Sequence, residues 1–312
     1  MTTILSVLGV VILLFVALEL FLAHFMATLI LEPAKNTCPT YQDVRERKNS
    51  KIASEREAFA NTDWDEYDAW ESEEMELMNG DTQITGVYHP VESARGCAIL
   101  AHGFGQNRLA MVPQAVLFRK LGFDVVLFDQ RRFGRSTAKY GSFGYLEGKD
   151  VACIVEWVKN RCGEDAKVVV CGVSMGAVSV MNALRYTDKI DYCVSDCGFA
   201  RFRQGYFFVY NRLIHIPNPF LIPIALKKAQ KLGIPLDQDN PVEAVTASDV
   251  PICVVHGDQD TAVSVECAYE LKAVLRNPKS RVEIFPGREH GYAICDHEKY
   301  YEMLRDFLKD VV

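Results

Sequence analysis

The sequence predicts an α/β fold in which helices cover both faces of a mostly parallel central sheet. From about residue 96 onward, short runs rich in Val, Ile and Leu alternate with segments of helical period. Near-continuous apolar strands of this kind are typical of parallel sheets that are buried on both faces. The chain has 312 residues, 49% of them hydrophobic and 24% charged. This length allows one large domain or two small ones.

An apolar run near the N-terminus predicts a membrane-spanning helix. Residues 4–31 contain only Glu19 and His24 as strongly polar positions, and about 20 apolar residues suffice to cross a bilayer. The run is too long for the core of a signal peptide, and it lacks a basic segment before it and a small-residue cleavage site. We therefore expect residues 1–31 to form a transmembrane signal anchor, with Glu19 tolerated inside it.

The residues around this run predict its orientation. No Lys or Arg precedes it, whereas five basic residues follow it closely: Lys35, Arg45, Arg47, Lys48 and Lys51. The positive-inside rule then predicts a single-pass protein of the cell membrane with its C-terminal bulk in the cytoplasm. The ten cysteines include no pairing with histidines that would complete a zinc site, so we expect reduced thiols and no metal. A net charge of −7 argues against nucleic acid as a partner.

Beyond the anchor, polar residues 32–62 are expected to be a juxtamembrane spacer and residues 63–312 the globular domain. A turn at Asn79-Gly80 between two alternating segments predicts a hairpin. Further strands are expected at 96–101, 123–128, 167–171, 190–195, 251–255 and 281–285. Helices are expected at 107–121, 146–161, 175–186, 263–275 and 297–310.

One insertion interrupts this alternation at about residues 198–248. It holds aromatic and proline-interrupted helical segments, and its length predicts a lid over the C-terminal edge of the sheet. Its aromatic residues are candidates for substrate contact: Phe202, Tyr206 and Phe207. Between Cys197 and Leu236 it carries six basic residues and no acidic ones. These could bind an anionic amphiphile or an anionic membrane leaflet, and a solvated basic exterior explains them equally well.

The segment VVVCGVSMGAVSVMN at residues 168–182 predicts a nucleophilic serine. Ser174 lies between Gly172 and Gly176 where a buried strand gives way to a helix of small residues, the pattern of a nucleophile elbow. Side chains at the two glycines would collide with the neighbouring strand and helix. The five-residue pattern alone is a modest signal, and its position between strand and helix strengthens it.

A serine nucleophile needs a base and a carboxylate, which α/β sheets place after strand ends. Asp258 and Asp260 both follow strand 251–255, and spacing alone does not separate them. His290, in a glycine-flanked loop after the last strand, is the predicted base. The backbone N–H groups of Met175 and Phe104 are the predicted oxyanion hole.

Six short sequences, in the same order, resemble the α/β-hydrolase superfamily. They are HGFG at 102–105, FDQRRFGRS at 128–136, GVSMGA at 172–177, SDCGFA at 195–200, HGDQD at 256–260 and EHG at 289–291. The chain is particularly similar to bacterial membrane-anchored hydrolases close to the prolyl-oligopeptidase and serine-aminopeptidase groups. This resemblance implies that Asp260 is the acid and Asp258 a turn residue. It assigns structural roles to Asp129, Arg131, Gly134 and Ser136, and it covers neither the residues before 85 nor the lid.

Together these features predict a membrane-anchored serine hydrolase that cleaves ester or amide bonds through a Ser174–His290–Asp260 triad and an acyl-enzyme, without cofactors. The expected substrate is a small or lipid-like acyl compound, or a peptide. Two alternatives stay open. One is a serine peptidase of the aminopeptidase or oligopeptidase type, and the other is a non-catalytic binding protein of the same fold.

Overall fold

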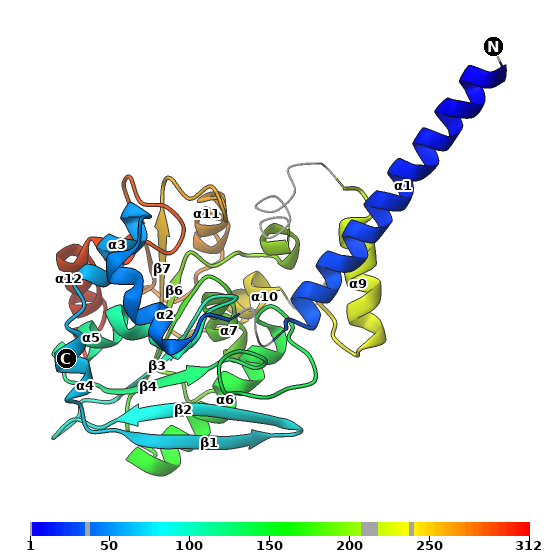
Figure 1. Ribbon diagram of the computed structural model, residues 1–312. Coiled ribbons are helices and arrows are strands. Elements are labelled where there is room, and N and C mark those ends of the chain that lie inside the picture. Colours follow the sequence, from blue (N-terminus) through cyan, green and yellow to red (C-terminus); the bar gives the residue numbers. More distant parts are fainter. Residues whose placement is uncertain (1, 35–37, 207–217, 237–239) are drawn as a thin grey trace.

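The computed structural model describes residues 2–34, 38–206, 218–236 and 240–312 (Figure 1). Within these residues, the strands form one sheet in the order β1-β2-β4-β3-β5-β6-β7-β8. The antiparallel pairs join β1 to β2 and β2 to β4, and the other neighbours are parallel. The strands are β1 (Glu73–Asn79), β2 (Thr82–His89), β3 (Cys97–Ala101), β4 (Asp124–Asp129), β5 (Val168–Val173), β6 (Tyr192–Asp196), β7 (Ile252–Gly257) and β8 (Arg281–Phe285). The predicted hairpin and mostly parallel sheet are confirmed.

Helices cover both faces of the sheet, as predicted. Alternate strand residues point to opposite faces, so Ile99 belongs to one hydrophobic cluster and Leu100 to the other. Val155 of α6 packs in the first cluster and Phe118 of α5 in the second. The helical elements of the sheet domain are η3 (Arg108–Met111), α5 (Val112–Lys120), α6 (Tyr145–Cys162), α7 (Met175–Ala183), α11 (Glu266–Lys272), η4 (Ala293–Cys295) and α12 (His297–Phe307).

The N-terminal helix α1 (Thr2–Leu31) combines an exposed half with a packed half. Within the described residues, Leu5–Leu31 is the helix that is long and apolar enough to cross a membrane, with a mean hydropathy of 2.8. Its first half projects away from the sheet domain (Figure 1). Its C-terminal residues Ala23, Met26 and Ile30 are buried, and α9 (Leu221–Lys231) lies beside them. The helix is thus joined to the part of the lid that the structure describes.

The contact between α1 and α9 includes polar groups. Lys228 Nζ lies 2.8 Å from Glu32 Oε1 and donates to Thr28 Oγ1 at 2.8 Å. Asn218 donates to the backbone oxygen of Glu19 at 2.7 Å. These bonds join the second half of α1 and Glu32, which follows it, to the described part of the lid.

Residues 38–70 pack on the sheet domain through short helices. Tyr41 Oη donates to Asp129 Oδ2 at 2.8 Å, and Phe59 is buried in the cluster around α5 and α12. Ser54 contacts η4, where its backbone oxygen accepts from Cys295 Sγ at 3.4 Å. The helices are α2 (Tyr41–Arg45), η2 (Glu46–Asn49), α3 (Ala53–Ala60) and α4 (Trp64–Asp68). Packing is therefore continuous across residues 62 and 63, where we expected the spacer to end.

The predicted lid contains helical segments, as expected. Besides α9 it holds helical residues 202–206 and α10 (Pro241–Ala247). Phe202 and Tyr206 are buried, with ring centroids 5.3 Å apart. Phe207, the third aromatic candidate, lies outside the described residues.

Candidate active site

Ser174 occupies a strained turn between β5 and α7. Its backbone has φ 56° and ψ −117°, a positive φ that non-glycine residues adopt rarely. The Ser174 N–H donates to the Asp196 oxygen at 2.8 Å, and the Ser174 oxygen accepts from Val178 at 3.1 Å. The turn is thus tied to β6 on one side and to α7 on the other, which holds the serine at the edge of the sheet.

Gly172 and Gly176 allow this turn to close. A Cβ at Gly176 would lie 2.0 Å from the backbone oxygen of Ala101 in β3. A Cβ at Gly172 would lie 2.2 Å from the backbone of Gly176 at the start of α7. Both distances are far inside van der Waals contact, so the expectation that side chains here would collide with the neighbouring strand and helix is confirmed.

The structure brings Ser174, His290 and Asp260 together. His290 Nε2 lies 2.8 Å from Ser174 Oγ, and His290 Nδ1 lies 2.7 Å from Asp260 Oδ2. The three residues come from the ends of β5, β8 and β7, which are parallel strands of one sheet. Because the carboxyl ends of parallel strands meet at one edge, residues separated by up to 116 positions meet there.

The two aspartates after β7 differ in their surroundings. Asp260 Oδ1 accepts the N–H groups of Ala262 and Val263, each at 2.8 Å, while Oδ2 faces His290. Burial alone would raise the pKa of Asp260, but hydrogen bonds from His256 and His290 hold that pKa well below its usual range. Asp258 is exposed and accepts the Gly287 N–H at 2.7 Å. Asp260 is therefore the carboxylate that contacts His290, and Asp258 supports a turn.

Side chains after the other strands hold the loops around the site. His102 is buried after β3, where its Nε2 accepts the Gln130 N–H at 2.9 Å.

In the turn after β4, Asp129 forms an ion pair with Arg108 at 3.0 Å. A Cβ at Gly134 would lie 2.2 Å from the Asp129 carboxyl carbon. Arg131 binds Asp150 at 2.6 Å, and Ser136 donates to the Asp129 oxygen at 2.5 Å. These contacts match the structural roles expected for this turn.

Cys197 lies beside the base. Its Sγ is 4.0 Å from His290 Nε2, and the residue is buried with a positive φ of 48°. In the described part of the chain, Cys197, Asp260 and His290 form the group whose ligating atoms lie within 4.8 Å of one another. Burial raises the pKa of the Cys197 thiol, which disfavours the thiolate that binds metals. The contacts of Asp260 and His290 described above account for this cluster without an ion.

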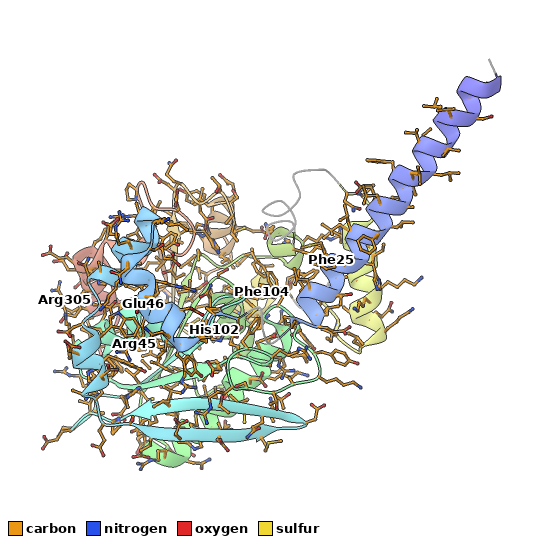
Figure 2. All side chains as sticks on the ribbon, in the orientation of Figure 1. Phe25, Arg45, Glu46, His102, Phe104 and Arg305 are labelled. Atoms are coloured by element: carbon orange, nitrogen blue, oxygen red, sulfur yellow. The ribbon has the colours of Figure 1, made fainter. Side chains whose placement is uncertain are left out.

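Of the two residues predicted to supply oxyanion donors, Met175 directly follows Ser174, and Phe104 lines the same cavity as Ser174. Met175 is the first residue of α7, so its N–H has no acceptor within the helix. Phe104 follows His102 and Gly103 in the loop after β3 (Figure 2). Its ring packs against Phe133 and Phe143, with centroids 5.4 Å away in both cases. These contacts fix the loop whose backbone borders the serine.

Ser174 and His290 open into a cavity of about 390 Å³. Most of the residues that line it are apolar, and they come from the loop after β3, the start of α5, the loop after β8 and the N-terminal segment. Six of the lining residues belong to the N-terminal segment 1–62: Leu29, Arg47, Ile52, Glu55, Ala58 and Phe59. Sequence reasoning missed these six. Five of them lie in a polar segment whose few apolar positions give no signal of where it packs, and Leu29 lies in the apolar helix α1, where lipid could equally be the neighbour. The cavity could hold an acyl chain.

The aromatic lid candidates lie elsewhere. Phe202 and Tyr206 do not line this cavity. They are buried in the cluster that also holds Phe199 and residues of α9 and α10. Residues of the N-terminal segment contribute to the wall of the cavity that contains Ser174, whereas these two aromatic residues do not.

Comparisons with known proteins agree with this architecture. The profile of the family described as "Serine aminopeptidase, S33" matches residues 92–225. The chain is 26% identical to the uncharacterized protein YqkD of Bacillus subtilis over 234 residues, which is 73% of this chain and 76% of YqkD. It is 25% identical to protein ABHD12B of Homo sapiens over 257 residues, covering 72% of this chain and 69% of that protein. Among solved structures, the Pyrococcus furiosus esterase Pf2001 has a TM-score of 0.64 at 24% identity, covering 80% of this chain and 94% of the esterase.

Proposed function

The chain is a member of the α/β-hydrolase superfamily, and we propose that it is a membrane-anchored serine hydrolase that cleaves esters through an acyl-enzyme. One observation carries the proposal: the continuous series of contacts from Ser174 Oγ through the His290 imidazole to the Asp260 carboxylate. A hydroxyl becomes a useful nucleophile when a base lies within hydrogen-bond reach and a carboxylate orients that base.

The proposed reaction has two halves. Ser174 Oγ attacks the ester carbonyl while His290 Nε2 takes the hydroxyl proton, and the ester C–O bond then breaks as His290 gives this proton to the departing alcohol. Water repeats the sequence on the acyl-enzyme, which releases the acid and returns the proton to Ser174. Asp260 holds the imidazole in the tautomer that accepts at Nε2. The N–H groups of Phe104 and Met175 stabilise the oxyanion, and each such donor is worth on the order of 10²–10³ in rate. The cycle uses no metal or organic cofactor.

The cavity supports an acyl substrate. Its lining is mainly apolar beside Ser174, and Leu29 of α1 contributes to it. A lipid-like acyl ester could therefore place its chain against Ile52 and Phe59 while its carbonyl meets the serine. Apolar burial stabilises such a complex by about 0.8 kcal/mol for each methylene removed from water.

We further propose that α1 anchors the protein in the cell membrane with the hydrolase domain in the cytoplasm. The basic residues after α1 and the ten free cysteines support this orientation. The test is an Ala94→Cys variant at an exposed position, treated with a membrane-impermeant maleimide and compared with the unchanged chain. Additional labelling only after permeabilisation supports the orientation. Additional labelling of intact cells contradicts it.

A serine peptidase is the second candidate function, because the matching family profile describes serine aminopeptidases. A panel of p-nitrophenyl esters of increasing chain length, assayed beside aminoacyl and peptidyl amides, separates the two. Ester turnover without amide turnover supports the esterase, and the reverse supports the peptidase. If neither is turned over and a fluorophosphonate does not label the chain, both proposals fail and a binding role is left.

A further inference from the structure

Gln114 is a buried polar residue in the wall of the cavity that contains Ser174. It lies in the first turn of α5, only 2% of its surface is exposed, and it lines the cavity together with Met111 and Pro113. Its Oε1 has no hydrogen-bond partner among the described residues. A buried amide oxygen that is left unpaired costs about 1–3 kcal/mol, so an unpaired oxygen on a residue that lines the cavity containing Ser174 calls for an explanation.

A local structural role does not account for this side chain. Gln114 is the third residue of α5, where a glutamine often accepts the backbone N–H before the helix. Here that bond is absent, since Oε1 has no partner in the described structure. Three other polar side chains that line the cavity are engaged with one another: Arg47 lies 3.2 Å from Glu55 and donates to Gln106 Oε1 at 2.5 Å. The amide of Gln114 therefore remains for a group inside the cavity.

The chemistry of the amide and the lining defines the partner. A carboxamide offers one acceptor and one donor group, and a hydroxyl both donates and accepts, so it complements either end of the amide. The cavity wall around Gln114 is apolar at Ala110, Met111 and Pro113, which disfavours a charged partner because burying a charge is costly. A neutral hydroxyl satisfies the amide without adding charge.

We propose that Gln114 determines specificity by binding a hydroxyl group of the ester substrate. The preferred substrates are then hydroxylated esters, with the hydroxyl on the acyl chain or on the alcohol. This inference rests on the proposed esterase function. A site built to hydrogen-bond a hydroxyl discriminates against the analogue that lacks it more strongly than an apolar pocket discriminates between chains.

The test measures kcat/KM of the purified full-length chain for matched pairs of esters. One arm compares p-nitrophenyl hexanoate with its 2-, 3- and 6-hydroxy derivatives. The other compares propyl octanoate with 1-octanoylglycerol. For at least one pair we expect the hydroxylated ester to be preferred by on the order of tenfold to a hundredfold. Gln114→Met, which keeps the length of the side chain but removes the amide, should abolish that preference.

Met111→Leu is the matched control, because this apolar neighbour lines the same cavity; it should change both members of a pair in parallel. The inference is overturned if the unchanged protein prefers no hydroxylated ester, or if Gln114→Met retains the preference. Fluorophosphonate labelling is measured in parallel. A chain that is labelled and hydrolyses both esters alike refutes the role of Gln114 alone, whereas a chain that is neither labelled nor active refutes the proposed function.

Discussion

Replacing Asp260 by Asn should nearly abolish turnover while leaving the fold in place. Asp260 Oδ1 accepts two backbone N–H groups, from Ala262 and Val263 at 2.8 Å, so an oxygen must stay on that side. The new NH₂ group then faces His290 Nδ1, which is also a donor in the active tautomer. The imidazole relieves this clash by accepting at Nδ1 and carrying its proton on Nε2, where it can no longer accept the proton of Ser174.

The expected loss in kcat is on the order of 10⁴, which corresponds to about 5.5 kcal/mol of transition-state stabilisation. The assay is kcat for a p-nitrophenyl ester, with circular dichroism as the folding check. Asp258→Asn is the matched control: Asp258 is exposed, and its carboxylate accepts the Gly287 N–H and the side-chain amide of Gln259 rather than contacting His290, so we expect a change within about threefold. Near-normal turnover by the folded Asp260→Asn variant, or a large loss in Asp258→Asn alone, refutes this assignment.

Three further perturbations test the surroundings of the site. Gly176→Ala should lower the melting temperature sharply, because the new Cβ would lie 2.0 Å from a backbone oxygen. Gly9→Ala is the control and should leave the melting temperature unchanged, since a Cβ there would have no atom within 4 Å. Equal melting temperatures of the two variants refute the close approach at Gly176. Burial raises the pKa of Asp196 to about 7, so the folded chain holds a proton there that the unfolded chain releases near pH 4, and the free energy of unfolding should fall as pH rises from about 4 to 7. Between pH 5 and pH 8 this fall amounts to about 3 kcal/mol, and Asp196→Asn should remove it, as denaturant unfolding at these two pH values checks; an unchanged difference contradicts the prediction. Phe59→Ala removes part of the cavity wall and so enlarges the cavity. The preferred ester should then have an acyl chain longer by about two to four carbons, as measured by kcat/KM across a chain-length series. An unchanged optimal chain length means that the acyl chain does not lie against Phe59.

The sheet and the residues at its edge were predictable because their signals are local. Apolar runs marked the strands, and the glycines around Ser174 marked the elbow through collisions that the backbone geometry reproduces. Candidates for the acid and base followed from the rule that parallel strands end at one edge, although Asp258 and Asp260 could be separated only by resemblance. The hydrogen bond to His290 distinguishes them directly.

The walls of the cavity were not predictable, because they depend on contacts between distant segments. Arg47 and Phe59 belong to a polar stretch whose composition matches a spacer, yet both line the cavity beside Ser174. Gln114 resembles any helical glutamine until its burial and its unpaired oxygen are seen. The packing of α1 on α9 was hidden for the same reason, since an apolar helix can be buried by lipid or by protein.

The most direct test of the whole account is to identify the atom that a fluorophosphonate modifies. The account predicts that mass spectrometry of the full-length chain finds one phosphonyl group, on the peptide that contains Ser174, and that Ser174→Ala is not labelled. Labelling of another residue, or undiminished labelling of Ser174→Ala, would contradict the claim that this serine is the nucleophile.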